Sequence, residues 1–498
     1  NGPTLRHKLM ALHQIGRVLE FNHADAAAED ALRQAIDLSP DQPQAVQHWI
    51  ALRQKQCKWP VVEGWDGVEA LRLLANLSPL STAVMFDDPV FQLARAAAYA
   101  RQSIARPSII HHHKDRQRER PARLKIGYVS SDLREHAVGF GLPEVMELHD
   151  RGRFEIHAYY CGIAREDPTR GRIRAAVEHW TEISGLTDDA AAARIAEDRI
   201  DILVDLNGYT RDARTGIFAR RPAPIAVNWF GYPGTMGAPF IDYIVADATL
   251  IRETERAFYS EKIITLPDTY QPSDSKRMID DAPSRAALGL PENAFVFCDF
   301  NNSFKITAPV FDIWMRLLGA VEGSVLWLLE SNAPMIVHLR AAAAARNIDP
   351  ARLIFAPRAP LARHIARQRA ADLFLDTLPY AAHTTASDAL FAGLPVLTCE
   401  GPTFAGRVAA SVLRAAGLPE LIASSLEEYE ALALRLARDR NALAALKAKL
   451  AGACTSAPLF DTARFTRHIE VAYRAAWERD QQSLAPDHIV IGAHQTMA

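Results

Sequence analysis

The sequence predicts an α/β fold in which two doubly wound, Rossmann-like parallel sheets follow an all-α region. Residues 1 to about 106 are rich in Ala, Leu and Gln and contain few β-branched runs, which is typical of helices. From Leu124 onward, short apolar runs alternate with helical patterns, as in parallel α/β sheets. A polar stretch at 271–283 separates this series from a second one of the same kind. We therefore expect two α/β lobes.

The all-α region, residues 1–106, contains one segment with the pattern of a tetratricopeptide repeat. Residues 28–40 space small and apolar side chains three and four positions apart and end at Pro40, and a new helical pattern opens at Ala45. Fewer than three such repeats are not stable alone. The repeat is therefore expected either to pack on the next part of the chain or to belong to a longer array.

Residues 107–122 are expected to form a linker before the first lobe. Three consecutive histidines, His111 to His113, fall within it. Consecutive imidazoles point in different directions and have no carboxylate partner here, so the run indicates a linker rather than a metal site. The mixed charges at 114–120 indicate a solvated segment.

Five strands are predicted in each lobe. In the N-terminal lobe, residues 123–270, they lie at 124–129, 154–160, 202–206, 225–229 and 243–246. The connector 271–283 leads to the C-terminal lobe, residues 284–457, with strands at 295–298, 325–329, 353–355, 373–375 and 396–398. A helix in the segment 458–482 is expected to return to the first lobe. Residues 483–498 are expected to form a tail.

One strand-to-helix junction carries the pattern of a nucleotide site. His383, Thr384 and Thr385 lie between the strand at 373–376 and a helix predicted from about 385 to 392. A helix start presents free N–H groups and a positive dipole end, which suit a phosphate. Asp388 follows one turn later, so its carboxylate can reach a ribose. On spacing alone, plain N-caps and a solvated acid explain these residues about equally well.

Composition and missing motifs exclude several classes of function. The net charge is −3 and the chain has no long basic run, so it lacks the pattern of a nucleic-acid-binding protein. No apolar run approaches the roughly 20 residues that a membrane span needs. Five scattered cysteines favour a reducing, cytoplasmic location. Neither a Gly-x-Gly-x-x-Gly motif after the first strand of a lobe nor a P-loop is present, which argues against dinucleotide oxidoreductases and P-loop kinases.

Six motifs occur in chain order at 127–132, 207–210, 221–225, 231–235, 259–262 and 383–385. Together they resemble the O-linked N-acetylglucosamine (O-GlcNAc) transferases, specifically a bacterial homologue, over about residues 20–480. The resemblance implies a GT-B fold in which two Rossmann-like lobes face a cleft. It also implies inverting, metal-independent transfer of GlcNAc from UDP-GlcNAc to Ser or Thr hydroxyls of proteins, with no cofactor.

The resemblance also implies roles for single residues. On the diphosphate it places Lys305, Asn302, His383, Thr384 and Thr385. On the ribose it places Asp388, and on the uracil it places the His364 ring and the backbone groups of Arg358 and Ala359. Gly231 belongs to a donor-site motif of the first lobe. Asp132 and His136 match a pair proposed as orienting acid and catalytic base.

Charge arguments support the role of Lys305 independently. No Asp-x-Asp triplet is available to hold a metal, so Lys305 and the helix start at about 385 are the cationic groups for a departing diphosphate. A helix end supplies at most about 2 kcal/mol. An ammonium 4 Å from a unit charge interacts by about 4 kcal/mol at an effective dielectric constant of about 20. Lys305 is therefore expected to contribute more.

The role of His136 stays open between general base and hydrogen-bonding positioner. An ordinary imidazole titrates near pH 6.5, which suits acceptance of a serine proton. Asp132, four residues earlier, could fix its tautomer if the segment is helical. The acceptor hydroxyl could instead lose its proton to a phosphate oxygen or to water.

Three residues depart from the animal pattern of the family. Leu361 replaces a lysine, Tyr380 a cysteine and Val138 a threonine. The alternatives are therefore a related protein glycosyltransferase that uses GDP-fucose or UDP-glucose, or an inactive transferase-fold scaffold. Against the scaffold, Lys305 and the threonine pair are intact. The expected partners are a UDP-sugar and a protein acceptor, read through the helical repeats.

Overall fold

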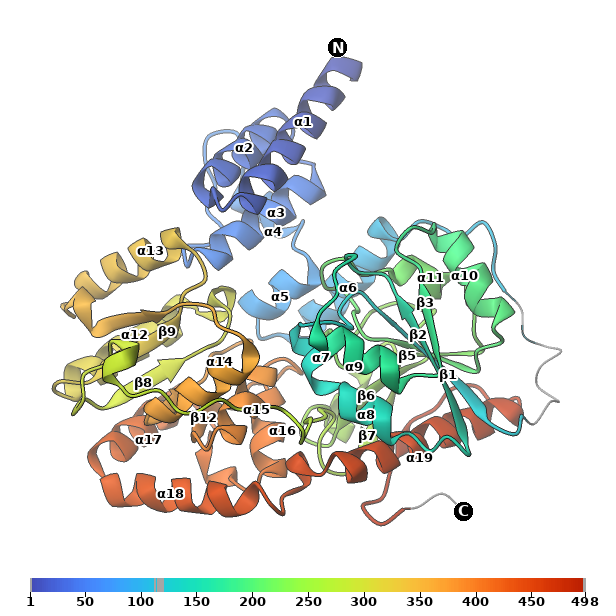
Figure 1. Ribbon diagram of the computed structural model, residues 1–498. Helices are drawn as coiled ribbons and strands as arrows, with labels where there is room; N and C mark the ends of the chain where they lie inside the picture. The colour runs from blue at the N-terminus through green and yellow to red at the C-terminus, as the bar shows by residue number, and fades with distance from the viewer. Residues whose placement is uncertain (1, 112, 114–120, 496–498) are drawn as a thin grey trace. The chain divides into compact units, whose positions relative to one another are not determined.

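The computed structural model describes residues 2–111, 113 and 121–495 (Figure 1). They form two compact units, each built from separate stretches of chain. The first unit comprises residues up to 87, 278–401 and 420–450. The second comprises 88–277, 402–419 and the residues from 451 onward. The linear domain boundaries given above stay a prediction.

The first unit begins with a small helical bundle. Its helices are α1 (Gly2–Phe21), α2 (Asp25–Leu38), α3 (Pro43–Lys55), α4 (Ala70–Leu74) and α5 (Pro79–Met85). The repeat-like pattern falls on α2, whose Leu32 and Ile36 are fully buried against Trp49 of α3. A fully buried apolar side chain of this size stabilises a fold by roughly 1.5–3 kcal/mol. The core of the bundle therefore follows the spacing seen in the sequence.

The bundle packs on the remainder of the first unit at the end of α3. The Lys55 carbonyl accepts hydrogen bonds from the Ser303 hydroxyl at 2.7 Å and from the Asn332 amide at 2.9 Å. One ring nitrogen of His338 lies 2.9 Å from the Gln56 carbonyl. These contacts satisfy backbone groups at a helix end that would otherwise lack partners.

A six-stranded parallel sheet forms the rest of the first unit, in the order β10-β9-β8-β11-β12-β13. Its strands are β8 (Val296–Asp299), β9 (Val325–Leu329), β10 (Leu353–Ala356), β11 (Leu373–Leu375), β12 (Val396–Cys399) and β13 (Ile422–Ala423). The helices are α12 (Ala308–Ala320), α13 (Ala333–Ala344), α14 (Leu361–Arg367), α15 (Thr384–Phe391), α17 (Leu426–Arg438) and α18 (Arg440–Ala453). Short 3-10 turns, including η3 (Ser303–Lys305), join several of them.

The second unit contains an eight-stranded parallel sheet, in the order β14-β7-β6-β5-β4-β1-β2-β3. Its strands are β1 (Leu124–Ser130), β2 (Phe154–Tyr160), β3 (His179–Glu182), β4 (Ile202–Asp205), β5 (Ile225–Asn228), β6 (Tyr243–Asp247), β7 (Lys262–Leu266) and β14 (Ile489–Val490). The helices are α6 (Pro89–Ser103), α7 (Ala137–Gly141), α8 (Pro143–Leu148), α9 (Pro168–Ala176), α10 (Asp188–Glu197), α11 (Thr215–Ala219), α16 (Val408–Ala415) and α19 (Thr462–Gln481).

Helix α19 packs on the eight-stranded sheet through buried polar and aromatic contacts. The Glu470 carboxylate lies 3.0 Å from a ring nitrogen of His149, and both side chains are buried. The Tyr473 hydroxyl lies 3.3 Å from that of Tyr128. These partners satisfy polar groups that would be costly to bury alone.

Two parallel sheets and a helical N-terminal region are therefore confirmed. All ten predicted strands are present within one residue at each end. The strands β3, β7, β13 and β14 were not predicted. β3 is a polar, partly exposed edge strand, and β13 and β14 have two residues each, so none of these three shows a buried apolar run. None of the helices in the described ranges has the length and apolarity that a bilayer crossing requires.

Candidate active site

The Lys305 side chain is buried at the carboxyl end of the six-stranded sheet. It leaves the turn η3 after β8 and is 8% exposed. Its ammonium donates to the Ala381 carbonyl at 2.8 Å and lies 4.3 Å from the centre of the Tyr380 ring. Burial lowers the pKa of Lys305 to about 8, although Asp376 and Asp299 favour the charged form. A cation therefore lies against the loop that leads into α15.

Asp376 holds that loop in place. Its Oδ1 accepts hydrogen bonds from the N–H groups of Thr377 at 2.7 Å and Ala382 at 2.6 Å, and its Oδ2 accepts from the Thr398 hydroxyl at 2.6 Å. Burial raises the pKa of this carboxyl, and its hydrogen bonds and Lys305 oppose that shift. One side chain therefore fixes both ends of the segment 377–382.

A second buried acid, Asp299, lies close to the same ammonium. Its pKa is raised to about 8, chiefly by burial and also by Asp376, while Lys305 lowers it. Its Oδ1 accepts the N–H of Asn301 at 3.0 Å, which shapes the turn after β8. Sequence reasoning missed both acids. The available signal was an aspartate at the end of an apolar strand, a pattern repeated at Asp205 and Asp247.

Helix α15 begins at the predicted threonines. His383 occupies the N-cap position and makes no side-chain cap bond, so neither threonine is a plain N-cap and that alternative was wrong. The first helical donors are Ala386 and Ser387, both to the His383 carbonyl, so the N–H groups of Thr384 and Thr385 precede the helical hydrogen bonds. The first turn can therefore bind an anion.

Side chains from two loops meet at the start of α15. The Thr385 hydroxyl donates to the Asn301 side-chain oxygen at 2.6 Å. The His383 ring stacks on Tyr380 with centroids 4.7 Å apart. Asp388, one turn along, is 8% exposed. Tyr380 thus contacts both the Lys305 ammonium and the His383 ring, a link that the sequence alone did not reveal.

The residues expected around the base lie on the loop after β10 and on α14, at the same sheet edge. Arg358 is exposed and Ala359 half-buried, and both follow β10. His364, on α14, is half-buried with its ring edge-on to Phe300 at 5.2 Å between centroids. Its Nδ1 accepts from the Arg367 guanidinium at 2.5 Å. Burial and Arg367 lower the pKa of His364 to about 3, so the ring is neutral and can stack on a base.

Asn302 completes the set of predicted residues in the first unit. It is exposed and occupies the N-cap position of η3, next to buried Asn301 and Ser303. Because the strands are parallel, the loops after β8, β10 and β11 all lie at one edge of the sheet. This fold therefore gathers the nine donor residues predicted in this unit at that edge.

In the second unit, Asp132 and His136 follow the carboxyl end of β1. Asp132 is buried, and its Oδ2 accepts from the Asn207 amide at 2.8 Å and lies 3.6 Å from His136 Nδ1. The sequence predicted that they could pair if the segment between them is helical. That segment is instead a turn, in which the Arg134 N–H donates to the Asp132 carbonyl at 2.8 Å. The two side chains nevertheless come together.

His136 is the N-cap of α7, and its Nδ1 accepts the Val138 N–H at 3.3 Å. A neutral ring that accepts at Nδ1 carries its proton on Nε2, and that tautomer follows from the hydrogen bond. Burial lowers the pKa of His136, Asp132 raises it and Arg134 lowers it further. The outer nitrogen is therefore a donor, which favours a positioner over a general base.

Gly231 follows β5 and has a structural reason for lacking a side chain. A Cβ there would lie 1.9 Å from the Leu206 carbonyl oxygen. Its N–H donates to the Trp229 carbonyl at 3.0 Å. The glycine is thus explained by close approach of two loops, whether or not it binds a ligand.

Comparison with known proteins identifies the class of the chain. Its residues 88–288 and 280–469 match the model of the family described as "Glycosyl transferase family 41". The solved structure of a Thermobaculum terrenum O-GlcNAc transferase mutant superposes with a TM-score of 0.72 at 28% identity, covering 96% of this chain and 99% of that one. The protein therefore has the GT-B fold of the glycosyltransferases.

More particularly, the chain belongs to glycosyl transferase family 41. Arabidopsis thaliana has a relative described as a probable UDP-N-acetylglucosamine–peptide N-acetylglucosaminyltransferase SEC, 38% identical over 376 residues and 74% of this chain. The Caenorhabditis elegans UDP-N-acetylglucosamine–peptide N-acetylglucosaminyltransferase is 30% identical over 480 residues and 74% of this chain. The chain spans only 38% and 42% of these two relatives. The family resemblance is thus confirmed, whereas a bacterial source stays a prediction.

Proposed function

We propose that this chain is an inverting glycosyltransferase that moves GlcNAc from UDP-GlcNAc to Ser or Thr hydroxyls of proteins. The observation that carries the proposal is the burial of the Lys305 ammonium against the loop that precedes α15. A buried cation beside a helix start stabilises the charge that a departing nucleoside diphosphate gains. The names of the relatives supply the donor and the peptide acceptor.

On the donor side, each group has a defined task. The Lys305 ammonium and the N–H groups of Thr384 and Thr385 bind the diphosphate. Asp388 accepts from the ribose hydroxyls, and the neutral His364 ring stacks on uracil. Arg358 and Ala359 offer backbone groups to the base edge, while Asn302 and His383 border the phosphates. Asp376 and Tyr380 keep this arrangement rigid before the donor arrives.

On the acceptor side, the hydroxyl oxygen attacks the anomeric carbon of the sugar. The bond from that carbon to the β-phosphate oxygen breaks, and its electron pair stays with UDP. His136 donates a hydrogen bond from Nε2 and positions the sugar or the hydroxyl, the Val138 N–H orients its ring at Nδ1, and Asp132 acts on the ring through its charge. Gly231, in the loop after β5, is assigned to the part of this lobe that contacts the sugar donor. The hydroxyl proton passes to a phosphate oxygen or to water.

We further propose a cytoplasmic setting and a protein acceptor read through the helical region. The buried thiols of Cys57, Cys161, Cys298 and Cys399 are unpaired, which supports a reducing compartment. No metal is needed for the diphosphate, because Lys305 and the start of α15 supply positive charge. The alternative is that the donor is GDP-fucose or UDP-glucose, since Leu361, Tyr380 and Val138 depart from the residue pattern of the animal members of the family.

The test measures UDP release and peptide modification with UDP-GlcNAc for the wild type and for Lys305→Ala. Loss of one preorganised charge-stabilising donor lowers kcat by about 10²–10³-fold. Lys449→Ala is the matched control, because Lys449 is an exposed lysine of the same unit that pairs only with Glu420 among described contacts. Equal turnover in wild type and Lys305→Ala would contradict the assignment. Calorimetry with UDP and GDP separates the donors, and a preference for GDP would overturn the role of His364.

A further inference from the structure

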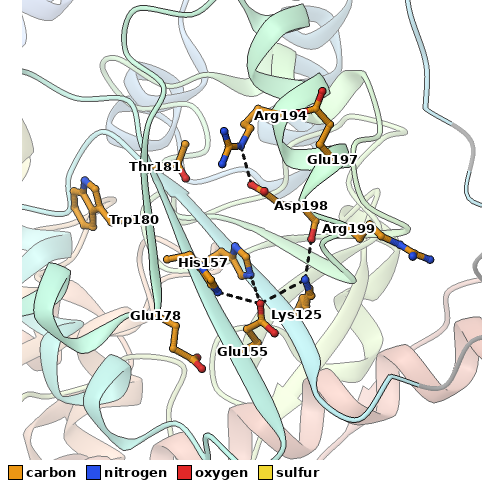
Figure 2. A pocket seen from close by; sticks show the side chains of 11 residues that line it. Lys125, Glu155, His157, Glu178, Trp180, Thr181, Arg194, Glu197, Asp198 and Arg199 are labelled. Carbon is orange, nitrogen blue, oxygen red and sulfur yellow. Dashed lines mark hydrogen bonds and ion pairs between the residues drawn. The ribbon is translucent and has the colours of Figure 1, made fainter.

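Two histidines and a glutamate meet on one face of the eight-stranded sheet, at the edge formed by β2 and β3. Figure 2 labels Glu155 and His157 of this group. The strands pair in parallel with His157 directly opposite His179. Glu155 precedes His157 by two residues, so its side chain emerges on the same face. Strand pairing therefore fixes three potential metal ligands next to one another.

The three ligand atoms lie close to one another. Nε2 of His157 lies 3.0 Å from Glu155 Oε1, and Nε2 of His179 lies 3.1 Å from the same oxygen. The two rings stack with centroids 4.1 Å apart, and one ligand atom from each residue lies within 4.8 Å of the others. In a tetrahedral zinc site with bonds of about 2.0–2.1 Å, ligand atoms are about 3.3 Å apart. The two distances from the glutamate oxygen to the histidine nitrogens are already close to that value.

We propose that Glu155, His157 and His179 form a binding site for a late first-row divalent metal ion, with Zn²⁺ as the natural candidate. Two imidazoles and one carboxylate are a ligand set that suits zinc. In the metal-bound state each neutral imidazole carries its proton on Nδ1 and offers the Nε2 lone pair. Water or a group from another molecule completes the coordination, because His179 opens to solvent with 50% of its side chain exposed.

Surrounding groups already orient the carboxylate. Glu155 Oε2 accepts from the Arg123 guanidinium at 3.1 Å, which leaves Oε1 for the two rings. The His157 ring also stacks near Tyr159, with centroids 6.3 Å apart, and is held almost wholly inside the protein. Such outer contacts raise metal affinity because they fix the ligands before the ion binds.

One group competes with the ion. The Lys125 ammonium lies 3.4 Å from Glu155 Oε1, as the dashed lines in Figure 2 show. It also donates to the Asp198 carbonyl at 3.2 Å, so it has a second partner when a metal takes the carboxylate. Removal of this ammonium should therefore strengthen metal binding, an outcome that a merely structural histidine pair would not produce.

The site is separate from the groups assigned to glycosyl transfer in the same unit. Glu155 is the second and His157 the central residue of β2, and His179 is the first residue of β3. Asp132 and His136 follow the carboxyl end of β1. The expectation that catalysis needs no metal is unaffected, since this ion would lie beside the middle of the strands, whereas Asp132 and His136 follow the end of β1.

The test measures Zn²⁺ and Co²⁺ binding to the full chain after removal of metal by a chelator. Because His111 to His113 could bind metal weakly, all variants carry alanine at these three positions. Competition with a chromophoric chelator gives the Zn²⁺ affinity, and the visible spectrum of Co²⁺ reports coordination. We expect one equivalent bound, an affinity at least about tenfold weaker in His179→Ala and Glu155→Gln, and a tighter site in Lys125→Met.

His179→Ala is the decisive variant, because this residue is exposed on an edge strand and its loss should leave the fold intact. His7→Ala, which removes an exposed imidazole outside the cluster, is the matched control and should bind as the parent does. The proposal is overturned if the parent binds no equivalent of Zn²⁺ at micromolar concentration, or if His179→Ala and Glu155→Gln both bind as tightly as His7→Ala. Anomalous scattering at the zinc edge from soaked crystals provides a check without substitution.

Discussion

The carboxyl-end loops of the two sheets hold their charged groups in different ways. In the first unit, Lys305, Asp299 and Asp376 are all buried and lie close to one another. In the second unit, His136 keeps 41% of its side chain exposed beside the buried Asp132. Under the proposed function, the first set faces a diphosphate of constant charge and the second faces protein acceptors that vary. The comparison shows that the charged groups of the first set are the more deeply buried.

The strongest way to break this comparison is to remove Asp376. In Asp376→Ala, the Lys305 ammonium loses a buried partner and the loop 377–382 loses its anchor. Breaking a buried charge pair from one side costs about 3–5 kcal/mol. Urea unfolding should show this loss, with little change in the control Asp41→Ala, whose carboxylate pairs with Arg72 at the surface. A stability equal to that of the control would mean that the loop does not depend on this acid.

Removal of the cation itself should affect turnover more than stability. For Lys305→Met we expect the same fall in kcat as for the alanine variant, about 10²–10³-fold. Steady-state kinetics with UDP-GlcNAc measures it. The methionine keeps the length of the side chain, so a fall limited to Lys305→Ala would indicate a packing role instead.

The buried acids should give the first unit a characteristic pH dependence. The pKa of Asp299 is raised from its ordinary 3.8 to about 8. Between those pH values the folded state binds more protons at this site than the unfolded state, so the contribution of this group to stability falls as pH rises. Asp299→Asn removes that contribution. The free energy of unfolding of the variant, relative to wild type, should rise from pH 4 to pH 8 in urea titrations, and a flat difference would contradict the shift.

Tyr380 offers a smaller and more selective test. Its ring contacts both the Lys305 ammonium and the His383 ring. A cation–π contact contributes about 0.5–2 kcal/mol, so Tyr380→Leu should weaken UDP binding by roughly tenfold in calorimetry. Tyr380→Phe keeps the ring and should bind nearly as wild type does. Equal loss in both variants would point to the hydroxyl rather than to the ring.

The smallest effect is expected at His136, and it concerns pH rather than rate alone. If its Nε2 is a donor, His136→Asn should lower kcat/KM by about tenfold or less. Loss of a general base would lower it more, because general acid–base catalysis contributes at least about 10²-fold. The shape of the pH profile should stay unchanged. Loss in the variant of an ionisation that lies below the ordinary imidazole value of about 6.5 would show instead that His136 acts as a base. Asp132→Asn should give a similar change, because it acts through the same ring.

The fold could be predicted from the sequence because most strand residues of both sheets are buried. Runs such as residues 225–227 and Val325–Leu329 are apolar throughout, which is the pattern of parallel strands covered on both faces. The strand at His179–Glu182 escaped prediction because it lies at the sheet edge and its residues are polar and partly exposed. The strands that were predicted are buried, whereas the strand at 179–182 is of similar length but partly exposed.

The site was only partly predictable. Helix-start chemistry at Thr384 and Thr385 is local and can be read from neighbouring residues. The pairing of Thr385 with Asn301, 84 residues away, depends on which strands lie side by side in the sheet. The same holds for Asp376, whose partners include Thr398. Contacts of this kind depend on the order of the strands in the sheet, so no local sequence pattern predicts them.

The interleaved path of the chain sets the order in which this protein can fold during synthesis. The first unit needs residues 420–450, and the second needs 402–419 and the residues from 451 onward. Because the ribosome adds residues from the N-terminus, neither unit can complete its fold until these late segments have been synthesised. Neither unit can be expressed as one contiguous fragment, and a premature stop after residue 400 would leave two incomplete sheets exposed to aggregation.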